Sequence, residues 1–586
     1  MKSFLKNILS TSLKIVLSLF LTIFICVGII SFSLSSLDNK KDITLKENTI
    51  LKIDLSKVTV VERTSENPFE SLNITGEMTE TISLKEVLDN IEKAKSDKKI
   101  TALYINTSDK LNAGISQIEE IRNKLLEFKQ TGKSIIAYAE TYSQSAYYLS
   151  SVANKLYLNP EGIIEIKGLS ASIMFYKGLL EKLDIDVQII RHGKFKSAVE
   201  PFMLEKMSKA NRDQVKLFLT SIAENIMDSI ACQRGLTLTK IQKHANNLSL
   251  ENAKACLNLS YTDALLYQDE LEDSLIYFSG GEELNIVSLQ KYSNVKIKKE
   301  VISSNKIAII YATGEIKSGE GDNQTIGSIT TSEAIKKARE DEKVKAIVLR
   351  INSPGGSALA SDVIWRETIL AKEKKPFVVS MGDLAASGGY YIACAADSII
   401  ANPTTLTGSI GVFGMIPNLQ NLYKNKLGIT IDTVNTNKHA DMGTNRPLST
   451  FEKKKIQKSV KDIYSTFITH VGEGRNMSTS AVDQIGQGRV WTGYDAKKIG
   501  LIDSYGGIEK ALEIAAYLAK VDDYRIISLP KKKDPFKAIL TLGNKNNLAT
   551  LLLSKIGIKS ELTQPIETLL NNDKIQARMP FIMTLE

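Results

Sequence analysis

The chain has 586 residues, of which 43% are hydrophobic and 24% charged, and these ordinary globular values predict a protein of several folded domains. The formal net charge of +9 is small for this length and is spread along the chain. It argues against a nucleic-acid partner and fits solubility with weak attraction to anionic lipid. None of the four cysteines forms a close CxxC pair, so zinc and redox sites of that kind are excluded.

The first predicted element is a membrane-spanning helix over residues 15–34. This segment, IVLSLFLTIFICVGIISFSL, is apolar and long enough to cross a bilayer. Three lysines precede it and the charges that follow nearly cancel, so the positive-inside rule places the short N-terminus in the cytoplasm and the rest outside. A cleaved signal peptide is the alternative, but the apolar run exceeds a usual signal core and no A-x-A site follows. We expect residues 1–40 to hold the cytoplasmic N-terminus and a single anchor.

The chain after this segment repeats itself at a spacing of 243 residues. The pairs that keep this offset are Tyr147-Tyr148 with Tyr390-Tyr391, Asn159-Pro160 with Asn402-Pro403, Gly168 with Gly411, and Ala253-Lys254 with Ala496-Lys497. Such self-similarity indicates a duplicated domain. We therefore predict copy one over residues 48–295, copy two over residues 304–528, and a C-terminal tail over residues 529–586. The tail begins near the basic stretch PKKKDPF, which is typical of a linker or surface segment.

Each copy alternates short β-rich runs with longer amphipathic stretches. In copy two, KIAIIYA (306–312) is followed by SEAIKKARED (332–341) and VKAIVLRI (344–351). This order indicates βαβ units with parallel strands and crossover helices, hence an α/β layered fold in each copy. The periodic segments 206–235 and 450–474 are predicted as long outer helices that pack copies or subunits together.

A glycine turn in copy two is the first candidate for chemistry. INSPGGS (351–357) directly follows an apolar strand, and the Gly355-Gly356 pair leaves backbone N–H groups open to a ligand because no Cβ shields them. This arrangement is typical of an oxyanion hole. The alternative is an ordinary tight turn before a helix, which the same residues form readily.

A serine one strand further on supplies a candidate nucleophile. In AASGGYY (385–391), Ser387 lies between the apolar run FVVSM (377–381) and a helical segment, so it is expected at a helix N-terminus. There the Gly388 N–H and the helix dipole would stabilise an oxyanion. The alternative is an N-cap serine followed by flexible glycines. Serine and glycine turn would occupy adjacent strand ends of one sheet, where α/β folds usually place their sites.

A serine at its free pKa is a poor nucleophile and needs a base. Only four histidines occur, and none has the setting of a catalytic triad. Lysine is the alternative, provided that burial lowers its pKa so that the free amine accepts the serine proton. The segment RHGKFKSAVEPF (191–202) contains Lys194 and Lys196 after an apolar strand, and the pattern alone does not choose between them.

These motifs resemble the signal peptide peptidase A family, also called protease IV, in its long duplicated form. The resemblance covers the N-terminal anchor, both copies, and the motifs NSPGGS, AASGGYY, TLTGSIG (405–411) and KSAVEPF. It implies that Ser387 is the nucleophile and that Lys196, rather than Lys194, is the general base, in tandem ClpP/crotonase-like domains without a cofactor. It also implies a bowl-shaped homotetramer, anchored in the inner membrane with its catalytic domains on the periplasmic side, that degrades residual signal peptides.

The repeat itself divides the site between the copies. Copy one has Gln144 at the Ser387 position and TSDKLNAG (107–114) in place of the glycine turn, while copy two has Ala440 near the Lys196 position, at an offset of 244. Each copy therefore lacks what the other supplies. Copy two also holds Lys438, aligned with Lys194, so a pair within copy two is the alternative. We expect Lys196→Ala to abolish peptide hydrolysis and Lys438→Ala to spare it.

The expected substrates are hydrophobic peptides at the lipid bilayer. An enclosed apolar site suits the core of a signal peptide, and exposed strand edges would align an extended peptide by β-augmentation. Thr407, Gly408 and Ser409 are expected to line the cleft. Two other classes stay open, a crotonase-like acyl-thioester enzyme and a catalytically silent membrane scaffold. Fluorophosphonate labelling that disappears in Ser387→Ala would indicate a serine hydrolase.

Overall fold

The computed structural model describes Ser18 and residues 44–64, 80–107, 111–295, 303–531 and 575–579. The predicted anchor over residues 15–34 lies outside the described residues except for Ser18. Within the described ranges no helix has the length and apolar character that a bilayer crossing requires. The span therefore stays a prediction.

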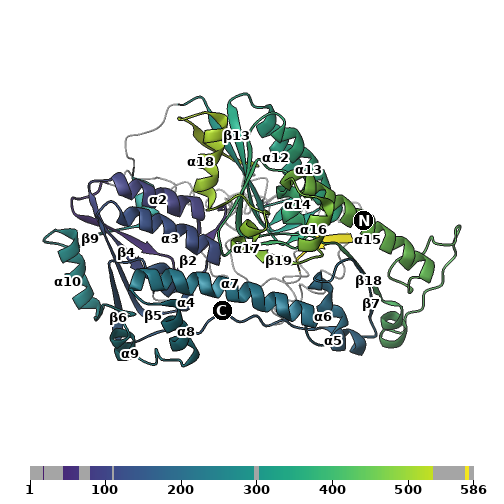
Figure 1. The fold of residues 1–586 in the computed structure, drawn as a ribbon, viewed down its shortest axis with the longest axis horizontal. Helices are drawn as coiled ribbons and strands as arrows, with labels where there is room; N and C mark the ends of the chain where they lie inside the picture. Colours follow the sequence, from purple (N-terminus) through teal and green to yellow (C-terminus); the bar gives the residue numbers. More distant parts are fainter. Residues whose placement is uncertain are drawn as a thin grey trace, which may run out of the picture.

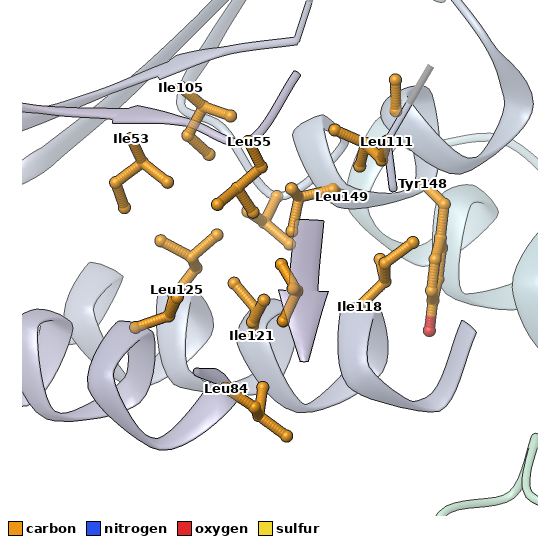
Figure 2. Close-up of a cluster of buried hydrophobic side chains, with 14 of the residues drawn as sticks. Ile53, Leu55, Leu84, Ile105, Leu111, Ile118, Ile121, Leu125, Tyr148 and Leu149 are labelled. Atoms are coloured by element: carbon orange, nitrogen blue, oxygen red, sulfur yellow. The ribbon is translucent and has the colours of Figure 1, made fainter. Parts of the chain in front are cut away.

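Copy one is built on a six-stranded parallel sheet in the order β8-β6-β5-β4-β1-β9. Parallel neighbours need crossover connections, which here include the helices α2 (Leu84–Ser96) and α3 (Ile115–Lys129). Figure 2 shows the resulting core, where Ile53 and Ile105 of the sheet face Ile121 and Leu125 of α3. The strands are β1 (Thr49–Asp54), β4 (Ile100–Asn106), β5 (Ser134–Tyr142), β6 (Lys155–Ile164), β8 (Ala264–Leu265) and β9 (Asn285–Ser288).

Copy two repeats this plan, which confirms the predicted α/β fold and the duplication. Its main sheet runs β19-β17-β15-β13-β10-β21, so β15, β13 and β10 follow one another as β5, β4 and β1 do in copy one. Side-chain contacts repeat as well, because Arg234 pairs with Asp263 in copy one and Arg475 with Asp503 in copy two. The strands are β10 (Lys306–Thr313), β13 (Val344–Ser353), β15 (Phe377–Ala386), β16 (Ser398–Ala401), β17 (Leu406–Gly408), β19 (Val490–Thr492), β20 (Ser504–Tyr505) and β21 (Arg525–Leu529).

A second six-stranded sheet joins the two copies, in the order β12-β11-β14-β22-β18-β7. Copy one contributes β7, which pairs antiparallel with β18 of copy two from Arg191↔Phe413 to Asp186↔Asn418. This pairing carries the chain that follows β7 to the centre of copy two. The strands are β7 (Asp186–Arg191), β11 (Glu315–Lys317), β12 (Thr325–Gly327), β14 (Gly355–Ser357), β18 (Phe413–Asn418) and β22 (Ile575–Arg578).

Two long helices also connect the copies, as their periodicity predicted. They are α7 (Lys209–Arg234) and α15 (Thr450–Arg475). Figure 1 shows α7 running along the lower side of the molecule from copy one toward copy two. There the Gln214 carboxamide accepts a hydrogen bond from the Val490 N–H of β19 at 3.3 Å, and the hydroxyls of Ser221 and Thr492 lie 3.0 Å apart.

A buried ion cluster fixes copy two against copy one. The Arg350 guanidinium of β13 is fully buried and donates to Glu62 and Glu120, both of copy one, with a shortest distance of 2.8 Å to each. It also donates to the Ser380 hydroxyl at 2.8 Å. Burial opposes the charge of Arg350, but the two carboxylates outweigh it and raise the pKa of the guanidinium above its usual range. The cluster holds the copies together on the strand that leads into the glycine turn.

Candidate active site

The structure brings Lys196 of copy one and Ser387 of copy two together. Lys196 follows β7 and precedes the short 3-10 helix Ser197–Val199, and its Nζ lies 2.8 Å from the Ser387 Oγ. Both side chains are fully buried. The two residues are 191 positions apart in sequence, so the contact depends on the pairing of β7 with β18. The expected juxtaposition of the two side chains is therefore present.

The surroundings of Lys196 favour a neutral amine. Burial holds the pKa of Lys196 well below its ordinary value of 10.5, because the charged form loses its hydration. The Nζ also lies 3.1 Å from the Ser409 hydroxyl and 3.2 Å from the Ser409 carbonyl oxygen. A free amine has two N–H donors and one lone pair. If the donors serve the two Ser409 oxygens, the lone pair is left for the Ser387 hydroxyl.

Ser387 sits on a tight turn between β15 and the helix α14 (Gly388–Ala393). Its φ of +56° is a left-handed conformation that residues with a Cβ seldom adopt, and such strain clusters at functional sites. The Ser387 N–H donates to the Gly408 carbonyl at 2.8 Å, which fixes the turn. Its side chain makes no capping hydrogen bond to α14. The N-cap interpretation of this serine is therefore wrong.

The predicted oxyanion glycines lie next to Ser387. A Cβ on Gly355, whose φ is +93°, would stand 2.6 Å from the Gly388 nitrogen, so the two backbones are in close contact. The Gly355 N–H donates to the Ser353 hydroxyl at 3.1 Å, and Gly356 pairs with Ile316 of β11. The Gly388 N–H, at the start of α14, has no hydrogen-bond acceptor among the described residues. Gly388 is thus the glycine whose amide is open to a ligand, and the oxyanion role stays a prediction.

The three residues expected to bind substrate are all fully buried. The Thr407 hydroxyl donates to the Ala385 carbonyl at 2.8 Å within the sheet. The Gly408 carbonyl holds the Ser387 N–H, and Ser409 holds the Lys196 amine. Their contacts position the catalytic pair, and contact with a substrate stays a prediction. Sequence reasoning missed the role of Ser409, for which the neighbouring glycines were the available signal.

The alternative bases lie elsewhere. Lys194 is exposed and its Nζ lies 5.7 Å from the centre of the Phe195 ring, while Lys438 is also exposed. At the copy-one position that matches Ser387, the Gln144 carboxamide accepts hydrogen bonds from the N–H groups of Lys167 and Gly168. Within the described residues, the Ser387 hydroxyl contacts Lys196 and the Gly411 carbonyl, and no histidine.

A strained serine beside a buried lysine defines a hydrolase with a serine nucleophile. The sequence model of Peptidase family S49 matches residues 127–275 and 369–522, one segment in each copy. The chain belongs to this family and is a serine protease. It is 37% identical over 453 residues to Protease 4 of Salmonella typhi, which covers 76% of this chain and 73% of that protein.

Two further similarities bear on function and fold. A protein of Enterococcus faecium named signal peptide peptidase SppA is 34% identical over 273 residues, covering 46% of this chain and 76% of that protein. Among solved structures, a ClpP1 variant from Listeria monocytogenes gives a TM-score of 0.24 at 15% identity, covering 35% of this chain and 94% of that one. A TM-score this low leaves the ClpP/crotonase-like fold of each copy a prediction.

Proposed function

We propose that this chain is a membrane-anchored endopeptidase with a Ser387–Lys196 dyad that degrades signal peptides after their release from preproteins. The observation that carries the proposal is the 2.8 Å contact between the Lys196 Nζ and the Ser387 Oγ in a fully buried setting. The name of the Enterococcus faecium relative supports the substrate class.

The buried dyad accounts for each chemical step. The Ser387 Oγ attacks the peptide carbonyl carbon while the free amine of Lys196 accepts the hydroxyl proton. The Gly388 N–H stabilises the oxyanion that forms on the carbonyl oxygen. Lys196 then gives its proton to the leaving amine, which leaves an ester on Ser387. A water molecule, deprotonated by Lys196, hydrolyses that ester and restores the enzyme.

The second sheet offers an extended substrate two strand edges. β14 and β18 run parallel to each other and flank a gap of one strand, because both pair antiparallel with β22. A peptide in this gap would make main-chain hydrogen bonds on both sides, which is recognition by β-augmentation. Main-chain recognition of this kind tolerates the varied apolar sequences of signal peptides.

The membrane arrangement is part of the same proposal. Residues 15–34 would form a single-pass anchor in the inner membrane and place both copies on the periplasmic side. In this proposal the copies have ClpP/crotonase-like folds, and four chains form a bowl-shaped homotetramer. The lysine gradient across the apolar segment and the family resemblance support these points.

The test is fluorophosphonate labelling combined with hydrolysis of a synthetic signal peptide. The parent protein should be labelled and should cut the peptide, and Ser387→Ala should lose both properties while it keeps the parent's thermal unfolding midpoint. A folded parent protein without labelling or hydrolysis would favour the scaffold. Turnover of an acyl-thioester without peptide hydrolysis would favour the crotonase-like enzyme.

A further inference from the structure

We propose that the protease cuts its own chain between Ala577 and Arg578, so that its C-terminal segment is a built-in substrate. This inference rests on the proposed function, because it uses the same serine and lysine. The segment is β22 (Ile575–Arg578), which lies in the tail where the sequence indicated only a linker or surface stretch.

β22 occupies the gap between β14 and β18 in the manner of a bound peptide. Toward the glycine turn it pairs antiparallel as Gly355↔Arg578, Gly356↔Ala577 and Ser357↔Gln576. On its other side Gln576 pairs antiparallel with Phe413 of β18. Both strand edges that flank the nucleophile are therefore engaged by this chain's own C-terminal region.

The position of one carbonyl group identifies the bond. The Ala577 oxygen lies 2.1 Å from where a Cβ on Gly355 would stand and 3.1 Å from where a Cβ on Gly388 would stand. These are the glycines on either side of the reacting centre, and Gly388 directly follows Ser387. The carbonyl that enters the space prepared by the two missing side chains thus belongs to Ala577.

Residues on both sides of this bond are held. The Met579 N–H donates to the Pro354 carbonyl at 2.7 Å, and the Arg578 guanidinium pairs with Glu315 of β11 at 3.1 Å. Ala577 is fully buried and Met579 is 3% exposed. A segment that only covered the site would not need contacts continuing past the carbonyl. The buried methyl group of Ala577 further indicates a pocket for a small side chain before the cut.

The reaction balances with water as the only co-reactant. A bond forms between the Ser387 Oγ and the Ala577 carbonyl carbon, and the bond from that carbon to the Arg578 nitrogen breaks. The hydroxyl proton passes through the Lys196 amine to the Arg578 nitrogen, which leaves as a free amine. Water then hydrolyses the ester, so the products are a chain ending in the Ala577 carboxylate and a nine-residue peptide from Arg578 to Glu586.

The experiment follows the intact mass of the full-length protein over time, with hydrolysis of a quenched fluorescent signal peptide measured on the same samples. The parent should lose the nine C-terminal residues at a rate independent of protein concentration, and Ser387→Ala should stay intact. Ala577→Asp places a charge in the buried position and should abolish self-cleavage while peptide hydrolysis continues. Ala577→Ser, a small neutral replacement, should still be cut.

The outcomes separate this inference from the proposed function. A parent that hydrolyses the signal peptide but keeps Glu586 overturns self-cleavage and leaves the proposed function standing. A rate that rises with protein concentration, cutting at another bond, or cutting of Ser387→Ala overturns it as well. A folded parent that cuts neither the signal peptide nor itself overturns the proposed function and this inference together.

Discussion

Replacing Lys196 by methionine separates the chemical role of the amine from the energetic consequence of burying it. Methionine keeps most of the volume and removes the base. General-base catalysis contributes on the order of 10²–10⁴-fold, so kcat should fall by at least that factor, about 3–5 kcal/mol in activation free energy. In the parent, kcat/KM should fall about tenfold per pH unit below the folded-state pKa of Lys196, because only the free amine accepts a proton.

The same substitution should change how stability depends on pH. The folded-state pKa of Lys196 is held below 10.5 by burial, so between that pKa and 10.5 the unfolded chain binds one more proton at this residue. The parent is therefore destabilised by about 1.4 kcal/mol for each unit that the pH falls through this window. Lys196→Met removes that dependence. Its loss of hydrogen bonds to Ser409 costs about 1–3 kcal/mol at every pH and cannot mimic the slope.

The assay compares thermal unfolding midpoints of the parent, Lys196→Met and Lys438→Met between pH 7 and pH 10.5. Lys438→Met is the matched control, because it removes an exposed lysine. The stability of Lys196→Met relative to the parent should decline as the pH rises, whereas Lys438→Met should follow the parent throughout and keep its activity. A stability difference for Lys196→Met that does not change with pH would refute a neutral buried amine. Activity retained by this variant would refute its role as base.

Three further predictions concern the surroundings of the dyad. Arg350→Met leaves two buried carboxylates of copy one unpaired and should lower the free energy of unfolding by about 3–5 kcal/mol in urea titrations. Gly355→Ala puts a methyl group 2.6 Å from the Gly388 nitrogen and should reduce peptide hydrolysis on the order of 10²-fold, measured as kcat. Burial raises the pKa of Glu119 from 4.5 to about 7, so the parent loses stability as the pH rises through this range. Glu119→Gln should unfold at a progressively higher temperature than the parent from pH 4.5 to 7, with a constant difference above pH 7.

The order of strands and helices followed from local sequence, and so did the pairing of Ser387 with a lysine from the other copy. Apolar runs of strand length that alternate with amphipathic stretches determine a parallel sheet. The offset repeat then showed which catalytic group each copy lacks. The choice of Lys196 over Lys194 needed the family resemblance, since both follow the same strand. The structure separates them by burial, because Lys194 is exposed and Lys196 is enclosed.

The features that sequence reasoning missed all depend on contacts between distant segments. Arg350 in the apolar run VKAIVLRI signals a buried charge, but its partners Glu62 and Glu120 lie far away in copy one. The strand β22 is four residues in a region of otherwise unremarkable composition, and its pairing is set by the edges of β14 and β18. Neither local propensity nor periodicity carries that information.

The division of the dyad between the copies also has a consequence during synthesis. A ribosome makes the lysine-bearing copy first and the serine-bearing copy second, and the base reaches the nucleophile only after β18 has emerged to pair with β7. In the proposed mechanism, every chain interrupted before that point has no working nucleophile. A protease that acts on hydrophobic segments is thereby silent while its own unfolded chain and neighbouring nascent proteins are exposed to it.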